Sequence, residues 1–337
     1  MASFTSDQRI NTEPMQQNEL VIELQTWLSN QIIGQEKLVN RLLIALLADG
    51  HLLVEGAPGL AKTKAIKTLA DGIEGEFHRI QFTPDLLPSD ITGTEIYRAE
   101  EGTFTFQKGP IFHNLILADE INRAPAKVQS ALLEAMGERQ VSYGRETFKL
   151  PELFLVMATQ NPIEQEGTYP LPEAQLDRFL MHVNIDYPDI VSEKQILQLV
   201  REESKSALSH NPPALPVPLS QQSIFAARQA ILNIHMEPVV EEYIVQLTMA
   251  TREPAKYGDD IANWLDYGAS PRGSIALDIC ARAFAWLQGN DFVSPSDVQA
   301  ILHDAFRHRI ILSFEAEASG VDANQVLDIL SERVAVA

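Results

Sequence analysis

The chain has 337 residues, of which 26 are Lys or Arg and 46 are Asp or Glu, so its formal net charge is −20. This acidic balance excludes a protein whose whole surface tracks nucleic acid, because phosphate binding depends on Lys and Arg. The hydrophobic share of 45% and the charged share of 21% are typical of a globular chain. The length predicts about two domains.

The cysteine count and the apolar runs exclude further classes. Cys280 is the only cysteine in the sequence, which excludes an intrachain disulfide and a zinc site built from cysteines. It lies in an apolar stretch over 275–287, where we expect a small core residue. No apolar run reaches the ~18 residues that span a bilayer, and residues 1–18 are polar and lack a signal-peptide core. We therefore expect a cytoplasmic protein without a membrane span.

The first half of the chain alternates between strand and helix patterns. Residues 1–17 are expected to form a flexible tail, and apolar spacing predicts helices over 18–29 and 35–47. Short apolar runs predict buried strands at 51–55, 77–82, 115–119, 154–159 and 179–185. Helical segments over 62–70 and 126–136 lie between them, so the pattern predicts a five-stranded parallel α/β sheet. Such a sheet binds ligands at the carboxyl ends of its strands.

The remaining segments predict two inserts, a linker and a second domain. Two stretches, over 95–108 and 140–150, predict β-hairpins inserted into the α/β core. Four prolines within 210–219 predict a semi-rigid linker, which we place over residues 191–219. Helices are expected over 221–232, 238–250, 274–287 and 295–308. We thus expect an α/β domain over residues 18–190 and an all-helical domain over residues 220–337.

A glycine-containing loop joins the first strand to the next helix. It consists of Gly56, Ala57, Pro58, Gly59, Leu60, Ala61, Lys62 and Thr63. Backbone N–H groups and the helix N-terminus would face a phosphate, Lys62 would add a point charge, and the Thr63 hydroxyl would ligate Mg²⁺. Ala61 replaces the glycine that usually precedes the lysine, so we expect it in a conformation compatible with a Cβ. The alternative is an ordinary turn with a surface lysine.

Polar side chains follow the third and fourth strands. Asp119 and Glu120 end the third strand, and Asn161 follows the fourth. Acids after an apolar strand are costly unless they meet a cation or water. Asp119 fits a Mg²⁺ ligand beside Thr63, Glu120 fits the general base that polarises an attacking water, and Asn161 fits an amide that orients water or touches the γ-phosphate. A turn with two acids is the alternative, but the order of these features favours nucleotide hydrolysis.

These residues belong to segments that resemble a known family. The segments 56–63, 115–125, 158–162 and 268–273 resemble AAA+ ATPases, and the runs 118–136 and 158–179 are closely similar to the MoxR group within them. Ala61 is itself typical of that group. The resemblance extends from about Ile32 to the last helix and is more specific in the sheet domain. It implies an α/β P-loop NTPase (AAA+) fold with a helical lid domain, and ATP and Mg²⁺ as cofactors.

The resemblance also implies roles for two arginines. Arg178 matches an arginine finger that reaches the nucleotide of the neighbouring subunit, where a guanidinium would neutralise charge on the transferred phosphoryl group. From the residues alone it would be a surface arginine at a helix end. Arg272 matches sensor 2 at the start of a lid helix and would reach the γ-phosphate in cis. The alternative is a helix-start arginine, which the helix dipole disfavours.

Three further expectations come from the same resemblance. Ile33 and Gly34 match the segment that lines the adenine. Gln81 is expected to be the polar switch that restrains Glu120. The two hairpins match the helix-2 and pre-sensor-1 inserts that this branch shares with magnesium chelatases and minichromosome-maintenance helicases.

Together these expectations describe a Mg-dependent, ATP-hydrolysing homo-oligomer, a hexameric ring, whose hydrolysis moves the lid against the sheet domain. The resemblance implies a chaperone-like role in activating or maturing client proteins, including proteins with a von Willebrand factor A-type domain. One alternative is a metal-insertion motor like that of magnesium chelatase, which shares the inserts. Another is a DNA-translocating helicase, against which the net charge counts. The third, a nucleotide-binding switch without turnover, leaves Glu120, Asn161 and Arg272 unexplained as a set.

Overall fold

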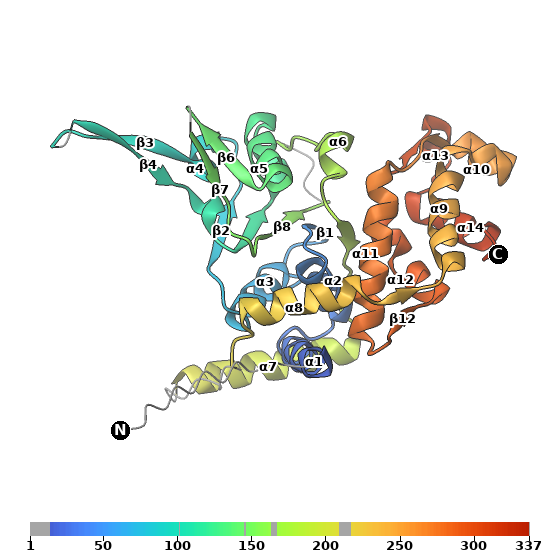
Figure 1. Cartoon of the computed structure of the whole chain (residues 1–337), viewed down its shortest axis with the longest axis horizontal. Helices are drawn as coiled ribbons and strands as arrows, with labels where there is room; N and C mark the ends of the chain where they lie inside the picture. Colours follow the sequence, from blue (N-terminus) through green and yellow to red (C-terminus); the bar gives the residue numbers. More distant parts are fainter. Residues whose placement is uncertain (1–13, 101, 145, 163–166, 209–216, 337) are drawn as a thin grey trace, which may run out of the picture.

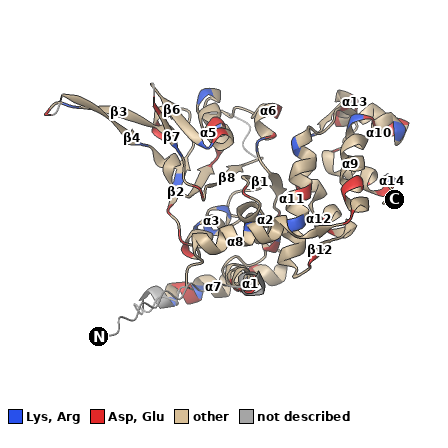
Figure 2. Cartoon of the chain, in the orientation of Figure 1, with Lys and Arg blue, Asp and Glu red and all other residues tan. Residues whose placement is uncertain are grey.

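The computed structural model describes residues 14–100, 102–144, 146–162, 167–208 and 217–336. A part built on a β-sheet and a part built of helices lie side by side (Figure 1). Acidic residues occur on both parts, so the net charge of −20 is spread over the molecule (Figure 2). In the described ranges, none of the helices combines the length and the apolar character that a membrane crossing requires.

The sheet has five strands in the order β2-β5-β8-β1-β9, and every neighbouring pair is parallel. The predicted five-stranded parallel sheet is therefore confirmed. Its strands are β1 (Leu52–Glu55), β2 (Phe77–Gln81), β5 (Leu115–Asp119), β8 (Leu155–Gln160) and β9 (Met181–Asn184). The register pairs Gln81 with Asp119 and Glu55 with Gln160, so the polar strand ends meet at one edge.

Alternate residues of the strands enter two apolar clusters, one on each face of the sheet. Leu52 and Val54 pack into the first cluster, whereas Leu53 packs into the second. Such alternation follows from the two-residue period of a strand. The first face is covered by α1 (Pro14–Gln31), α2 (Glu36–Leu47) and α3 (Lys62–Asp71). The second is covered by α4 (Pro88–Thr92) and α5 (Ala126–Glu138).

Both predicted hairpins are present. The first pairs β3 (Gly93–Arg98) with β4 (Thr103–Lys108), and the second pairs β6 (Gln140–Tyr143) with β7 (Glu146–Lys149). Phe106 joins them, because its ring stacks on that of Phe148 with 4.3 Å between centroids. The first hairpin projects from the sheet part (Figure 1). Short helical turns complete this part: η1 (Pro110–Phe112), η2 (Ile121–Arg123) and α6 (Glu173–Leu176).

The predicted linker over 191–219 is wrong in its first part, where the chain forms helix α7 (Ile190–Leu208). The helix begins because Asp189 Oδ1 accepts a hydrogen bond of 2.7 Å from the Ser192 N–H. Residues 209–216, which hold three of the four prolines, lie outside the described residues. So do residues 1–13 of the predicted tail, whereas residues 14–17 already belong to α1.

The lid is helical, as predicted, but it also contains two short strand pairs. Its helices are α8 (Gln221–Leu232), α9 (Pro238–Arg252), α10 (Asp259–Trp264), α11 (Pro271–Leu287), α12 (Pro295–Phe306), α13 (Phe314–Ala318) and α14 (Ala323–Arg333), with the turn η3 (Pro254–Lys256). The strand pairs are β10 (His235–Met236) with β12 (Phe292–Val293), and β11 (Leu265–Tyr267) with β13 (Ile311–Leu312). Cys280 is fully buried in α11, and burial raises its pKa to about 12, so it is the core residue we expected.

One apolar cluster continues from the sheet into the lid. It contains residues of α1, α2, α8, α11 and α12 as well as the first face of the sheet. A buried ion pair adds a polar link, because Arg41 Nε on α2 donates to Asp304 Oδ2 on α12 at 2.7 Å. The junction between the sheet part and the lid is therefore a packed interface.

Candidate functional site

The loop between β1 and α3 needs glycine at two positions. A Cβ on Gly56 would lie 2.5 Å from Ile185 Cγ1, so a larger residue would push the loop away from Ile185, which directly follows β9. Gly59 has a φ of +86°, in the left-handed region that glycine adopts without strain. These two residues turn the chain sharply from β1 into the N-terminus of α3.

Ala61 does not behave as the sequence predicts. We expected a conformation compatible with a Cβ, but Ala61 has φ +58° and ψ 15°, which is left-handed. This conformation costs an alanine about 1–2 kcal/mol. The loop therefore keeps the geometry of a glycine at the N-cap of α3, and the alanine is strained by it.

One cavity, which we call the loop cavity, collects the predicted phosphate-binding and acidic residues. Its volume is about 370 Å³. It is lined by Pro58, Gly59, Leu60, Ala61, Lys62, Thr63, Lys64, Asp119, Glu120, Thr159 and Asn161. These residues come from the carboxyl ends of β1, β5 and β8, as expected for a ligand site on a parallel sheet.

Lys62 is the half-buried cation of the loop cavity. Its Nζ donates to Gly56 O at 2.5 Å and to Gln160 O at 3.3 Å. Burial lowers the pKa of Lys62, while the nearby Asp119 and Glu120 oppose that shift. The ammonium group therefore stays close to the acids and to the carbonyl groups where β1 and β8 end.

Asp119 is buried and held by two residues that sequence reasoning missed. Thr159 Oγ1 donates to Asp119 Oδ1 at 2.6 Å, and Arg79 Nη2 on β2 donates to Asp119 Oδ2 at 2.6 Å. The sequence offered no signal for Arg79, because its approach to Asp119 depends on the register of two parallel strands, in which Asp119 pairs with Gln81, two residues after Arg79. Arg79 thus compensates the charge of the buried carboxylate.

Glu120 is held in place by side chains around the same edge. Its backbone has φ +56°, and its N–H donates to Thr159 Oγ1 at 2.9 Å. Gln81 Nε2 donates to Glu120 Oε2 at 2.8 Å, which is the contact expected between these residues. Arg123 Nε lies 3.0 Å from the same oxygen. The carboxylate is therefore fixed on the β2 side of the loop cavity.

A second, more apolar cavity of about 270 Å³ adjoins the loop cavity. Both are lined by residues 58–61 and Lys64, so they meet at the phosphate loop. Ile33 lines the second cavity, and Gly34 lies beside it, where a Cβ would come within 2.8 Å of Ser192 Cβ at the start of α7. The other wall of this cavity was not predicted from the sequence. It is formed by Tyr187 and by Ile196, Leu199 and Val200 of helix α7. The apolar spacing of these residues was the signal for it.

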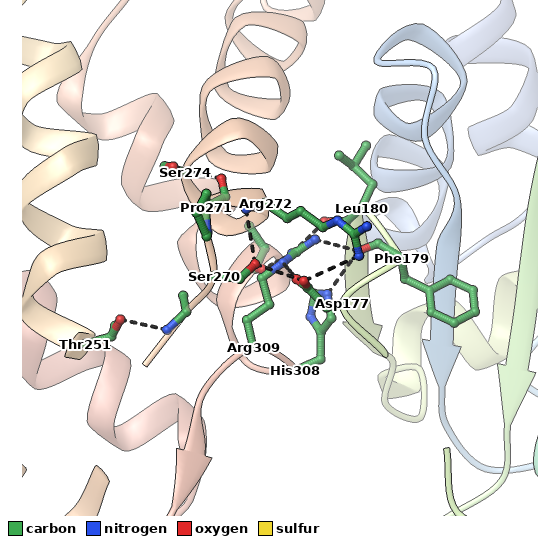
Figure 3. A network of polar contacts seen from close by, with 12 residues as sticks. Asp177, Phe179, Leu180, Thr251, Ser270, Pro271, Arg272, Ser274, His308 and Arg309 are labelled. Carbon is green, nitrogen blue, oxygen red and sulfur yellow. Dashed lines mark hydrogen bonds and ion pairs between the residues drawn. The ribbon is translucent and has the colours of Figure 1, made fainter. Parts of the chain in front are cut away.

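Arg178 and Arg272 lie elsewhere. They line a third cavity of about 320 Å³, which we call the arginine cavity. Its charged residues are Asp49, Arg139, Asp177, Arg178, Arg272 and Arg309. Arg272 is absent from the described residues that line the loop cavity, so the structure does not bring it to that site within one chain, as the expected role in cis would require. The reason is that the start of α11 is bound to residue 177 instead (Figure 3).

Neither of these two arginines is fully compensated by a carboxylate. Arg178 Nη1 donates to Leu133 O at 2.7 Å, and within the described residues its guanidinium has no carboxylate partner. Arg272 Nη1 lies 3.7 Å from Asp177 Oδ2, and its side chain is 58% exposed. Two cationic groups therefore stand at the seam between the sheet part and the lid, open to an anion from outside the chain.

Comparisons with known proteins agree with this architecture. The model of the "ATPase family associated with various cellular activities (AAA)" matches residues 51–181, and an "AAA lid domain" matches residues 261–330. A proposed ATPase from Cytophaga hutchinsonii has a crystal structure that superposes with a TM-score of 0.87, at 44% identity over 96% of both chains. The fold is thus a P-loop AAA+ fold with a helical lid.

Two relatives narrow the family. Chaperone MoxR1 of Mycobacterium tuberculosis is 45% identical over 306 residues, which are 90% of this chain and 79% of that protein. Protein MoxR of Paracoccus denitrificans is 34% identical over 85% of this chain and 87% of its own length. On this fold and these matches, the chain belongs to the MoxR family of AAA+ ATPases.

Proposed function

We propose that the protein binds ATP together with Mg²⁺ and hydrolyses it to ADP and phosphate. The observation that carries this proposal is the meeting of two cavities at the phosphate loop. The apolar cavity beside Ile33 and Gly34 fits an adenine, and the loop cavity holds the cationic and acidic groups that a triphosphate requires. Family membership in AAA+ ATPases supports the same activity.

The residues of the loop cavity fit Mg²⁺ bound to a nucleotide. Asp119 and Thr63 offer one carboxylate and one hydroxyl, the small set of protein ligands that Mg²⁺ takes when phosphates and waters complete its shell. No cluster of three His, Cys, Asp or Glu side chains that could hold a metal occurs within the described ranges, which fits this shared site. Bound there, Mg²⁺ would neutralise charge on the phosphate oxygens.

The side chains that line the loop cavity bind the phosphates, accept the proton of the attacking water and orient the reacting groups. Lys62 and the N–H groups of the loop bind the outer phosphates, because cationic and N–H donors converge there. Glu120 accepts a proton from the attacking water, which requires that its carboxylate leaves Gln81 and turns into the loop cavity. Asn161 lines the same cavity and orients the water or the γ-phosphate by hydrogen bonding.

Arg178 and Arg272 act in trans in this proposal. Both lie outside the loop cavity of their own chain, in a cavity with more arginines than acids. A neighbouring copy in a ring would place its γ-phosphate against them, where two guanidinium groups stabilise the charge that develops during transfer. The protein would then be active as a homo-oligomer, and we infer a hexameric ring.

The proposed biological role is supported by one relative that is named as a chaperone. We infer a chaperone-like ATPase that activates or matures client proteins, including von Willebrand factor A-type proteins, in the cytoplasm. A metal-insertion motor is the alternative, and the captured partner decides between them. A tagged Glu120→Gln form should retain a client in the presence of ATP, with Lys62→Ala as the matched form that cannot bind nucleotide.

The activity itself is tested by phosphate release from Mg·ATP by the purified full chain. We expect turnover that stops when EDTA removes the metal and that falls to background in Glu120→Gln. Turnover of Glu120→Gln at the wild-type rate would refute its role as general base. No phosphate release by the wild-type chain at any protein concentration would refute the ATPase proposal.

A further inference from the structure

We propose that Asp177 is a positioning residue that holds Arg178 and Arg272 together as one pair and ties this pair to the lid. This inference rests on the proposed trans role of the two arginines. Asp177 directly precedes Arg178 in the chain and caps the C-terminal end of α6. Its carboxylate faces away from the sheet and toward the lid, as Figure 3 shows.

Both carboxylate oxygens of Asp177 bind lid residues. Oδ1 accepts from Arg309 Nε at 2.8 Å, and Oδ2 accepts from Ser270 Oγ at 2.9 Å. Ser270 is the N-cap of α11, and its Oγ also accepts from the Arg272 N–H at 3.1 Å. The same carboxylate oxygen lies 3.7 Å from Arg272 Nη1. Asp177 therefore binds the cap of the helix that carries Arg272 and lies near its charged group.

Arg309 fixes the other side of this junction. It is 8% exposed, and besides Asp177 it donates to Phe179 O at 2.7 Å and to Leu180 O at 3.1 Å. A further hydrogen bond joins it to Ala305 O in α12. Arg309 of the lid thereby binds residues 177, 179 and 180, which flank Arg178 on both sides. A guanidinium, with its planar set of donors, can bind one carboxylate and several carbonyl groups at once, which a lysine cannot do as well.

The excess of arginines in the arginine cavity explains why the carboxylate of Asp177 is needed there. The arginine cavity contains four arginines and two acids. Asp49 is shared by Arg139 and Arg228, and Asp177 is the carboxylate that faces Arg309 and Arg272. Without the charge of Asp177, Arg272 and Arg309 would repel each other. Residue 177, which directly precedes Arg178, would then be held less firmly against the lid. The two arginines that we place on the neighbour's nucleotide would then no longer share a defined geometry.

The consequence is a mechanical link. When the lid moves, Ser270 and Arg309 carry Asp177 with them, and Arg178 follows because it is the next residue. A displacement of about 1 Å in a catalytic group costs up to ~100-fold in rate. Uncoupling should therefore change kcat, whereas ATP binding in the loop cavity of the same subunit should not change.

The test is Asp177→Asn, which keeps the shape of the side chain and removes its charge. We expect an unchanged Kd for ATP and a kcat that falls by about 10- to 100-fold. The matched control is Asp260→Asn, because Asp260 pairs with Arg333 at 2.7 Å on the lid surface, away from the arginine cavity. This control should hydrolyse ATP like wild type. Ser270→Ala, which removes one of the lid contacts, should give a smaller loss in kcat in the same direction.

Subunit mixing separates positioning from a general structural defect. Asp177→Asn subunits keep their own loop cavity, and Glu120→Gln subunits keep intact arginines. Mixed rings should therefore regain activity at the subunit interfaces where the loop cavity of an Asp177→Asn subunit receives the arginines of a Glu120→Gln subunit. A melting temperature within a few degrees of wild type shows that the variants are folded. No recovery, with mixing confirmed by co-purification of two tags, would overturn the proposal.

The outcome also distinguishes this inference from the function on which it rests. If Arg178→Ala hydrolyses ATP at the wild-type rate, the trans role of the arginines is wrong. If Arg178→Ala is slow and recovers on mixing while Asp177→Asn and Ser270→Ala both turn over like wild type, only the positioning role is wrong. A large rise in the Kd for ATP in Asp177→Asn would also overturn it.

Discussion

Gln81 Nε2 lies 2.8 Å from Glu120 Oε2 and donates a hydrogen bond to it, while Arg123 Nε lies 3.0 Å from the same oxygen. The acid that we propose as the general base is thus held at the β2 edge by two side chains. Gln81 is bound in turn, since its Oε1 accepts from Arg79 Nη2 at 2.7 Å. Arg79 also binds Asp119, so the two acids are linked through β2.

We expect Gln81→Leu to raise the basal rate of ATP hydrolysis. A hydrogen bond to a charged group contributes ~1.5–3 kcal/mol, and Arg123 still restrains Glu120, so a rise of up to about tenfold is expected. Phosphate release at saturating ATP measures it. The control is Gln107→Leu, an exposed residue of β4. A fall to the level of Glu120→Gln would show that Gln81 orients the base for catalysis instead of restraining it.

Lys62→Ala should abolish measurable ATP binding. Lys62 is the cation of the phosphate loop, and its Nζ stands at the inner edge of the loop cavity. Titration calorimetry with Mg·ATP measures the loss. Lys67→Ala is the matched control, because Lys67 is an exposed lysine on the same helix. Unchanged affinity in Lys62→Ala would remove the phosphate-loop interpretation.

Arg178→Ala should bind ATP normally and hydrolyse it poorly. Loss of an arginine finger costs ~10³–10⁵ in rate. Activity restored at even a few subunit interfaces would therefore be detected over this low background. Mixing this variant with Glu120→Gln should return part of the activity, because some seams then pair an intact Glu120 with an intact Arg178. If the mixed rings stay inactive although both variants are in one assembly, Arg178 acts within its own subunit or is structural.

Ala61→Gly should raise the free energy of unfolding. The left-handed backbone costs an alanine about 1–2 kcal/mol, whereas the extra freedom of glycine in the unfolded chain costs only ~0.4–1 kcal/mol. The expected net gain is thus ~0.5–1 kcal/mol by urea denaturation. Ala57→Gly in the same loop is the control and should destabilise, because Ala57 does not have a positive φ. A loss in both variants would contradict the strain at Ala61.

The parts of the fold that local patterns encode could be predicted. The five strands, both hairpins and the loop before Lys62 depend on apolar periodicity and glycine placement within a few residues. The convergence of Asp119, Glu120 and Asn161 follows from the shared direction of parallel strands. In these regions the sequence pattern and the structure agree, apart from the left-handed backbone of Ala61.

The parts that depend on long-range packing could not be predicted. The pairing of Arg79 with Asp119 depends on the register between β2 and β5. The place of Arg272 depends on how the lid sits on the sheet, which the continuous core through α2, α8 and α11 determines. Helix α7 is a different case: its apolar residues have helical spacing, but the prolines that follow favoured a linker for the whole segment.

The last prediction concerns stability against pH and His51. This residue is 5% exposed, and its Nδ1 accepts a hydrogen bond of 3.1 Å from the Val156 N–H, so the folded state requires a neutral ring. Burial, with help from the nearby Arg139, lowers its pKa from 6.5 to about 3. Between these two values the unfolded chain binds a proton that the folded chain does not bind. The free energy of unfolding should therefore fall as pH decreases below 6.5.

Each pH unit in this window is worth up to ~1.4 kcal/mol, so about 2 kcal/mol should be lost at pH 5 through His51. The comparison variant is His51→Asn, whose Oδ1 can accept the same Val156 N–H but does not titrate. Urea denaturation between pH 5 and pH 7.5 should show a pH slope smaller by about one proton in this variant. The difference between the two slopes isolates His51 from other buried groups such as His308, whose pKa is also lowered by burial. Parallel pH profiles for the two proteins would show that His51 does not stay neutral in the folded state.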